Sequence, residues 1–272
     1  MNEDSPGVYI PTSDPNTYES TPLSNAGWYE EGQHGGSLAA LVVGHVEKLP
    51  TLTPMEISRI TLELFRVVPL VPLTIEARIV REGKKIQVVK AEVSDPQGQL
   101  LAMAVVQRLR IAAEPAPNQE RTTLKLTLPQ DIPVRSESEP WGVGSADKVM
   151  FHRNAIEFRE VYGGFNTPGP GAIWLRLRKP IIAGEGTTPS QRAVVVADFC
   201  NGVSRELNND WLFMNPDLTI HLGRYPVGEW VALEAESHYS DSGRGVAAGT
   251  LWDTSGWVGR SAQSLFLEHF DK

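Results

Sequence analysis

The chain has 272 residues, 41% hydrophobic and 21% charged, a balance typical of a protein that folds in water. Its formal net charge of −8, from 33 acidic and 25 basic residues, disfavours nucleic acid or an anionic membrane as a partner. Cys200 is the single cysteine, which excludes an internal disulfide. The acidic N-terminal segment lacks the apolar core of a secretion signal, and no apolar run reaches the length of a membrane span. We therefore expect a cytoplasmic protein.

The first predicted element is a helix over residues 36–48. Leu38, Val42 and Val46 recur at every fourth position, and most residues between them are also apolar. Such a helix should be buried on nearly every face. Ser37 is its candidate N-cap, and the prolines that follow position 49 should end it.

Four segments with alternating apolar residues come next, and turn signals rich in Pro, Gly and Asp separate them. They cover residues 57–65, 73–80, 85–93 and 100–109. Turns this short leave no room for the crossover that parallel strands need, so we expect antiparallel pairing.

Residues 111–147 lack periodicity and contain prolines in a polar setting, which indicates a linker. Beyond the linker, strands are predicted at 150–161 and 172–178, followed by a second buried helix at 198–208. The remaining predicted strands cover residues 218–222, 230–237, 245–252 and 259–266.

The last third of the chain repeats the first third at a distance of 158 residues, without gaps over the aligned stretch. Residues 61–66 align with 219–224, and 95–98 align with 253–256. One buried helix and several strands in each copy predict an α+β protein of the double-hotdog type, with two long buried helices wrapped by a continuous antiparallel sheet.

We expect an N-terminal hotdog unit (1–110), a Pro-rich linker (111–147) and a C-terminal hotdog unit (148–272). Two units in one chain would join their sheets and remove one exposed edge. Edge strands would still remain, so we expect a homodimer or a larger homo-oligomer.

The two copies differ where their predicted helices start: Gly35-Gly36 in the first copy and Asp198 in the second. An acid at a helix N-terminus can simply cap free amides, or it can act as a base or position a water molecule. Gln263 lies in a strand that is otherwise turning apolar, where a glutamine needs hydrogen-bond partners. Thr219 is either an ordinary strand residue or a third group that holds a water molecule.

The second half of the chain resembles the acyl-CoA thioesterase II family, the TesB-like double-hotdog thioesterases. The resemblance rests on the order of several short motifs: Asp198, Asp217-Leu218-Thr219, Ser242-Gly243-Arg244-Gly245 and Gln263, with Gly35-Gly36 in the first half. It implies that Asp198, Thr219 and Gln263 together orient a hydrolytic water molecule, with no metal or other cofactor. The chain departs from the family at His221-Leu222-Gly223 and at Ser264, which bears on acyl-chain preference more than on the type of reaction.

The leading hypothesis is therefore hydrolysis of an acyl-CoA thioester to a free fatty acid and CoA. His34, Gly35 and Gly36 are the candidate substrate-binding residues, and a backbone amide near the two glycines would polarise the thioester carbonyl. The alternative is a non-catalytic acyl-CoA binding or sensing protein of the same fold. An enoyl-CoA hydratase of this fold would need a histidine five residues after the acid, where the chain has Val203.

Other polar residues have simpler interpretations. The histidines show no metal-binding spacing, His221 is interpreted first as a satisfied interior histidine, and Cys200 as a small buried hydrophobe. No Gly-x-Ser-x-Gly motif is present to support a serine hydrolase. A basic cluster is either a solvated strand face or a site for the CoA phosphates; it consists of Arg78, Arg81, Lys84, Lys85 and Lys90.

Overall fold

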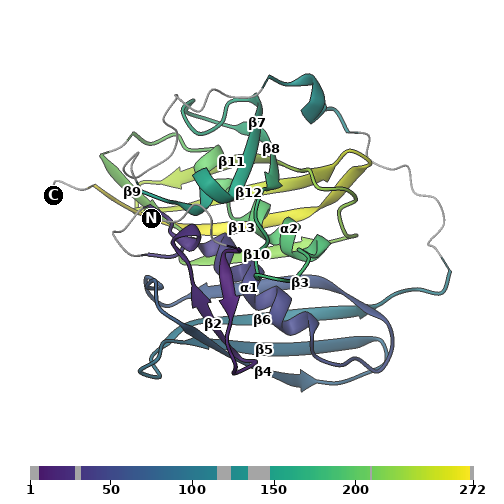
Figure 1. The fold of residues 1–272 in the computed structure, drawn as a ribbon. Coiled ribbons are helices and arrows are strands. Elements are labelled where there is room, and N and C mark those ends of the chain that lie inside the picture. The colour runs from purple at the N-terminus through teal and green to yellow at the C-terminus, as the bar shows by residue number, and fades with distance from the viewer. Residues whose placement is uncertain (1–5, 28–31, 115–123, 134–147, 209, 270–272) are drawn as a thin grey trace.

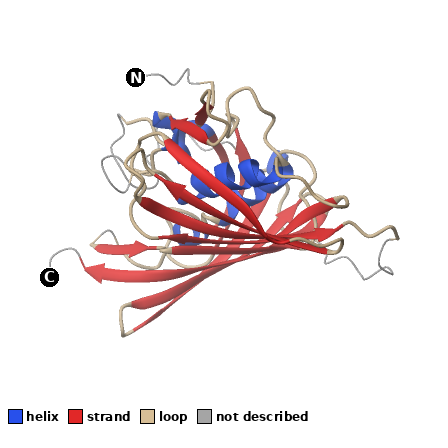
Figure 2. Cartoon of the chain, turned by 90° about the horizontal axis from the view of Figure 1, so that it is seen from below, coloured by secondary structure: helices blue, strands red, loops and turns tan. Residues whose placement is uncertain are grey.

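The computed structural model describes residues 6–27, 32–114, 124–133, 148–208 and 210–269. Within these residues, thirteen strands form one sheet that curls around the helices (Figures 1 and 2). The ladders between neighbouring strands are antiparallel, and the sheet runs without a break from one copy to the other through the pairing of β3 with β10. The predicted α+β, double-hotdog architecture is confirmed.

The strands of the first half are β1 (Tyr9–Pro11), β2 (Thr17–Ser20), β3 (Met55–Leu64), β4 (Leu73–Arg81), β5 (Ile86–Ser94) and β6 (Leu100–Arg110). Those of the second half are β7 (Ile156–Tyr162), β8 (Gly171–Leu177), β9 (Trp211–Met214), β10 (Asp217–Leu222), β11 (Val231–Ser240), β12 (Arg244–Asp253) and β13 (Gly256–His269). Their order across the sheet is β1-β2-β4-β5-β6-β3-β10-β13-β12-β11-β8-β7, and β9 pairs with β13 beside β10.

Helix α1 (Gly35–Glu47) agrees with the predicted first helix, and its residues from Gly36 to Val46 are buried. Its N-cap is His34 rather than Ser37, whose hydroxyl donates to the His34 carbonyl at 2.8 Å. At the other end, the guanidinium of Arg108 donates to the carbonyls of Val46 and Leu49. A cation at the helix C-terminus satisfies carbonyls that have no partner within the helix.

The second buried helix is not where the sequence analysis placed it. Helix α2 covers Pro189–Ala197, a short helix α3 (Cys200–Val203) follows, and Asp198 is the C-cap of α2 instead of a helix start. The true start is a capping box in which Thr188 and Gln191 bond to each other's backbone amides, with Pro189 at the first helical position. The aliphatic residues of α2 come before Asp198, so a helix predicted to start at Asp198 does not include them.

Strands β3 and β10 form the seam between the two copies. Residue Thr219 pairs with Thr61, which is its counterpart in the 158-residue repeat. Equivalent residues of two copies can pair in this way only at a local two-fold axis, so the repeat of the sequence is also a symmetry of the fold.

Three segments differ from their predicted structure. The strand expected at 150–161 begins only at Ile156, because Phe151–Ala155 form a π-helical turn. Of the predicted linker, the described residues 124–133 contain a short 3₁₀ turn, Pro129–Asp131, and Leu124, Leu126 and Ile132 pack on a cluster around Trp174. The N-terminal residues form β1 and β2, which the sequence analysis did not predict; a 3₁₀ turn, Pro22–Ser24, follows them.

The N-terminal segment connects the two copies. Val8 and Tyr9 hydrogen-bond through their backbones to Pro180 and Ile181, whereas β2 pairs with β4 of the first copy. The buried hydroxyl of Tyr9 also donates to Gln33 at 2.7 Å, just before α1. Among the described residues, no helix is both long and apolar enough to span a membrane.

Candidate active site

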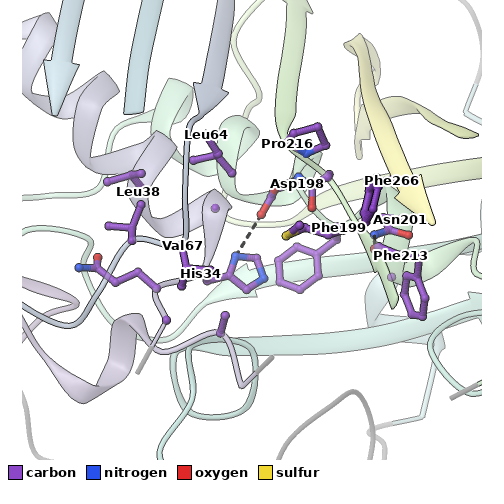
Figure 3. Close-up of a pocket in the computed structure, with 18 of the residues that line it drawn as sticks. His34, Leu38, Leu64, Val67, Asp198, Phe199, Asn201, Phe213, Pro216 and Phe266 are labelled. Carbon is purple, nitrogen blue, oxygen red and sulfur yellow. Dashed lines mark hydrogen bonds and ion pairs between the residues drawn. The ribbon is translucent and has the colours of Figure 1, made fainter. Parts of the chain in front are cut away.

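A cavity of about 670 Å³ lies where α1 starts, where α2 meets α3, and where β9 leads into β10 (Figure 3). This volume is within the range of small-molecule sites. Its apolar lining includes Leu38, Val68, Phe165, Phe199, Phe213 and Phe266. Its polar lining includes Gln33, His34, Asp198, Asn201, Arg205 and Asn215.

Three hydrogen bonds hold the side chain of Asp198 in the wall of this cavity. Its Oδ2 accepts from the backbone N–H of Gly36 at 2.5 Å, and its Oδ1 accepts from Gln263 Nε2 at 2.8 Å and Asn215 Nδ2 at 3.1 Å. The side chain is 6% exposed. A carboxylate offers about four acceptor positions, so these three donors leave one, on Oδ2, for a further partner.

The two glycines at the start of α1 are required by this contact. A Cβ atom at Gly35 would lie 3.0 Å from Oδ2 of Asp198, and one at Gly36 would lie 3.0 Å from its Cβ and 3.1 Å from the Val195 carbonyl oxygen. Glycine therefore lets the helix N-terminus approach the carboxylate closely. Of the two glycines predicted to bind substrate, Gly35 is in the lining of the cavity and Gly36 is not.

Gln263 holds Asp198 in place from the buried face of β13. Its Nε2 donates both to Oδ1 and, at 3.1 Å, to the backbone carbonyl of Asp198, and its Oε1 accepts from the N–H of Asn201 at 3.2 Å. Both N–H groups and one acceptor position of the amide are thus used, and the Asn201 N–H determines which end of the amide faces the carboxylate. Gln263 is 1% exposed, so it acts on the cavity through Asp198.

Asn215 was missed by the sequence analysis. Strands β9 and β10 both pair with β13, but the five-residue step from Met214 to Thr219 spans only the four-residue step from Phe266 to Ala262. The extra residue forms a β-bulge within residues 215–218, where Pro216 also removes a backbone donor. Asn215 lies two residues after the buried Phe213, so it shares the inner face of β9, and it donates to Asp198. An Asn-Pro pair between two short strands is the signal that could have indicated it.

Thr219 is not brought to Asp198. Residues directly opposite in an antiparallel pair share a face, and Thr219 is opposite Ala262, which is exposed, whereas the next residue, Gln263, is buried. The Thr219 hydroxyl donates to Thr61 at 3.3 Å on this outer face. Of the three residues predicted to share a water molecule, the structure therefore brings together Asp198 and Gln263.

His34 reaches the cavity from the N-cap of α1, as Figure 3 shows. Its Nδ1 accepts from the Gly36 N–H at 3.1 Å and lies 3.1 Å from Oδ2 of Asp198. Its ring packs against Phe151 and Phe199, at centroid distances of 5.0 and 4.9 Å.

A second histidine enters the cavity wall from the π-helical turn. The ring centroid of His152 lies 6.5 Å from that of His34. Burial, together with the neighbouring His34 and Arg153, lowers the pKa of His152 to about 3, so this ring is neutral near pH 7. π-helical turns are frequent at functional sites, and no sequence pattern indicated this one.

The fold contains a counterpart of the Asp198 site at the opposite ends of the two helices. Glu47, at the end of α1, accepts from the hydroxyls of Thr188, at 2.8 Å, and Ser190, at the start of α2. At this junction the donors to the carboxylate are side-chain hydroxyls, whereas beside Asp198 the helix start consists of glycines and the donor is a backbone amide. Each helix therefore ends on a carboxylate that receives donors from the start of the other, but Glu47 is not in the lining of the cavity described above.

Other expectations are resolved by position. His221 is exposed rather than an interior histidine. Cys200 is buried as predicted, its Sγ lies 2.9 Å from Ser261 Oγ, and burial raises the pKa of its thiol to about 12. The basic cluster on β4, β5 and their connecting turn does not line the cavity, whereas Arg66 and Arg205 do. Within the described ranges, no three His, Cys, Asp or Glu side chains gather as metal ligands would.

Two family models match the chain. Residues 25–109 match the N-terminal domain of acyl-CoA thioesterases, and residues 129–267 match their C-terminal domain. No curated protein matches the chain significantly.

Solved structures with little sequence identity share the fold. A hot dog fold protein of unknown function from Alicyclobacillus acidocaldarius is 16% identical, with a TM-score of 0.74 over 94% of this chain and 95% of that one. A provisionally assigned thioesterase from Novosphingobium aromaticivorans is 19% identical, with a TM-score of 0.73 over 96% and 98%. The acyl-CoA thioesterase II TesB2 from Mycobacterium marinum is 13% identical, with a TM-score of 0.64 over 95% of each chain.

Proposed function

Because this chain belongs to the acyl-CoA thioesterase family, we propose that it hydrolyses an acyl-CoA thioester to a free fatty acid and CoA. The observation that carries the proposal is the Asp198 carboxylate, which Gln263, Asn215 and Gly36 hold in the wall of the cavity.

In this proposal the free acceptor position on Oδ2 of Asp198 binds the hydrolytic water. Asp198 removes a proton from this water as its oxygen bonds to the thioester carbon, and the carbonyl electron pair moves onto oxygen. The tetrahedral intermediate then collapses, the carbon–sulfur bond breaks, and the departing sulfur takes the proton from Asp198. The products are a carboxylic acid and the thiol of CoA, and the Asp198 carboxylate is restored.

Two features of the site support water attack rather than direct attack by the carboxylate. Three donors surround Asp198, and each would have to move or stretch if Asp198 were to bond to the substrate carbon. They also fix the direction of the remaining acceptor position, which is what a base needs in order to align a water molecule. Gln263 and Asn215 are accordingly positioning residues in this proposal.

The lining of the cavity is consistent with such a substrate. Phe199, Phe213 and Leu38 offer apolar surface to an acyl group, and Arg66 and Arg205 offer positive charge to the phosphates of CoA in a chain whose net charge is −8. We therefore propose Arg66 and Arg205, ahead of the basic cluster on β4 and β5, as phosphate contacts.

The test is release of free thiol from a panel of acyl-CoA esters by the parent protein, Asp198→Asn and Glu47→Gln. Asp198→Asn keeps the shape of the side chain and removes the base, so kcat should fall about 10²-fold or more. Glu47→Gln makes the same chemical change at the other junction between α1 and α2 and should keep the parent turnover.

Equal turnover by parent and Asp198→Asn would refute the mechanism. Tight binding of acyl-CoA by a parent that releases no thiol from any ester would instead support the alternative, a non-catalytic acyl-CoA binding or sensing protein.

A further inference from the structure

The Gly36 amide is already occupied by Asp198, so it is not free to polarise the thioester carbonyl. The expected donor was an amide near Gly35-Gly36, but the Gly36 N–H is directed at Oδ2 of Asp198 and at Nδ1 of His34. A carbonyl oxygen that develops negative charge still needs a donor fixed in advance.

The proton on His34 is placed by its N-cap role. The Gly36 N–H donates to Nδ1 as well as to Asp198, so we assign a lone pair to Nδ1 and the proton of the neutral ring to Nε2. A doubly protonated ring would instead donate from Nδ1 to Oδ2 of Asp198, 3.1 Å away, and would also carry a proton on Nε2. In both states Nε2 is a donor.

Nε2 of His34 has no acceptor among the residues that the structure describes, although the residue is only 9% exposed. In Figure 3 the nitrogen that faces Asp198 is joined to it by a dashed line, and the other ring nitrogen points away from Asp198, toward Phe199. The rings of Phe151 and Phe199 pack against the imidazole, at centroid distances of 5.0 and 4.9 Å. The donor therefore belongs to a largely buried ring, has no acceptor among the described residues, and lies beside the proposed base.

We propose that His34 is a catalytic residue whose Nε2–H donates to the carbonyl oxygen of the thioester. This inference rests on the proposed function. As the water oxygen bonds to the thioester carbon, the carbonyl electron pair moves onto oxygen and the Nε2–H bond to that oxygen strengthens. When the carbon–sulfur bond breaks, the pair returns to form the carboxylic acid. His34 neither gains nor loses a proton.

Two substitutions separate this role from capping. His34→Asn keeps a side-chain acceptor for the Gly36 N–H, as asparagine is a strong N-cap, but it removes the donor at the Nε2 position. His34→Gln places an amide N–H near the position of Nε2 and gives up the cap. His221→Asn, on the exposed outer face, is the matched control and should keep the parent kcat.

We expect kcat to fall about 10²- to 10³-fold in His34→Asn with little change in KM, and to recover by about tenfold or more in His34→Gln. Thermal unfolding should show the opposite order, with His34→Gln the less stable protein. A role limited to capping predicts an active His34→Asn, and a role as the base predicts that both variants are inactive; either result would overturn the proposal.

A spectroscopic readout separates this inference from the proposed function. In the Asp198→Asn background, the infrared carbonyl band of a bound acyl-CoA labelled with ¹³C at the carbonyl should lie at lower wavenumber than in solution. Adding His34→Asn should return it toward the solution value, and an unchanged band would overturn the inference. A shifted band in a parent protein that releases no thiol would refute the proposed function and support the His34 contact.

Discussion

The hydroxyl of Thr219 donates to that of Thr61 at 3.3 Å, and the two residues are 158 positions apart in the sequence. They mark the local two-fold axis of the fold on the outer face of the sheet. Elsewhere in the fold, Gly36 donates to Asp198 where α1 starts and α2 ends, and Ser190 donates to Glu47 where α2 starts and α1 ends. Of these two helix junctions, the one at Asp198 borders the cavity.

Asn215 should be more important for turnover than Thr219. Asn215→Ala removes a donor to Oδ1 of Asp198, so kcat should fall about tenfold or more, because a misaligned base costs rate. Thr219→Ala alters the outer face and should keep the parent kcat. Thiol-release assays on both variants test the pair. If Thr219→Ala loses turnover and Asn215→Ala does not, Thr219 would have the water-positioning role that the family resemblance implies.

Gln263→Glu should impair the enzyme although it hardly changes the side-chain volume. The substitution replaces the Nε2 donor to Asp198 with a second carboxyl oxygen, so the two acids would repel or share a proton. We expect about a 10²-fold loss in kcat, measured alongside circular dichroism to confirm folding. Parent turnover in a folded Gln263→Glu protein would show that this amide serves stability only.

Gly35→Ala should lower both stability and turnover. The added Cβ would lie 3.0 Å from Oδ2 and 3.2 Å from Oδ1 of Asp198, so α1 and the carboxylate would have to separate. Gly186→Ala is the matched control, because a Cβ there would meet no atom within 4 Å. Melting temperature and kcat should fall together in the first variant and change little in the second. Parent values in Gly35→Ala would mean that the junction is looser than these distances indicate.

Stability should decline on acidification partly through His152. Its pKa is lowered to about 3 in the folded protein, against 6.5 for a free histidine, so below pH 6.5 the unfolded chain binds a proton that the folded chain refuses. The contribution is complete above pH 6.5 and decreases as the pH falls toward 3, by about 1.4 kcal/mol for each pH unit.

His152→Gln should remove this dependence. Urea unfolding at pH 7.5 and 5.5 should show a loss of free energy of unfolding in the parent that is about 1 kcal/mol larger than in the variant. His45, whose pKa burial also lowers, contributes equally to both proteins. Equal losses in the two proteins would show that His152 is not held neutral.

Local patterns in the sequence determined most of the elements. The all-round apolar pattern of residues 36–48 predicts a buried helix, and α1 is that helix. Alternation at 57–65 and 259–266 predicts strands within a few residues of β3 and β13. These predictions succeed because apolar residues recur along the sequence with the period of the helix or strand wherever one of its faces is buried. The start of α2 also has a local signal, the capping-box sequence Thr188-Pro189-Ser190-Gln191, which the prediction of the second helix did not use.

Tertiary structure decided which polar residues meet. Asp198 and Gln263 were identified through their resemblance to a family, but no local pattern places Gly36 within 2.5 Å of a carboxylate 162 residues away. Nor does any reveal the bulge within residues 215–218, because a bulge is defined by the partner strand it fails to match. One extra residue reverses which face the side chains take, so Asn215 reaches Asp198 and Thr219 turns to the outside. Periodicity is a property of a single segment, whereas the site depends on the register between segments, and only the packed sheet sets that register.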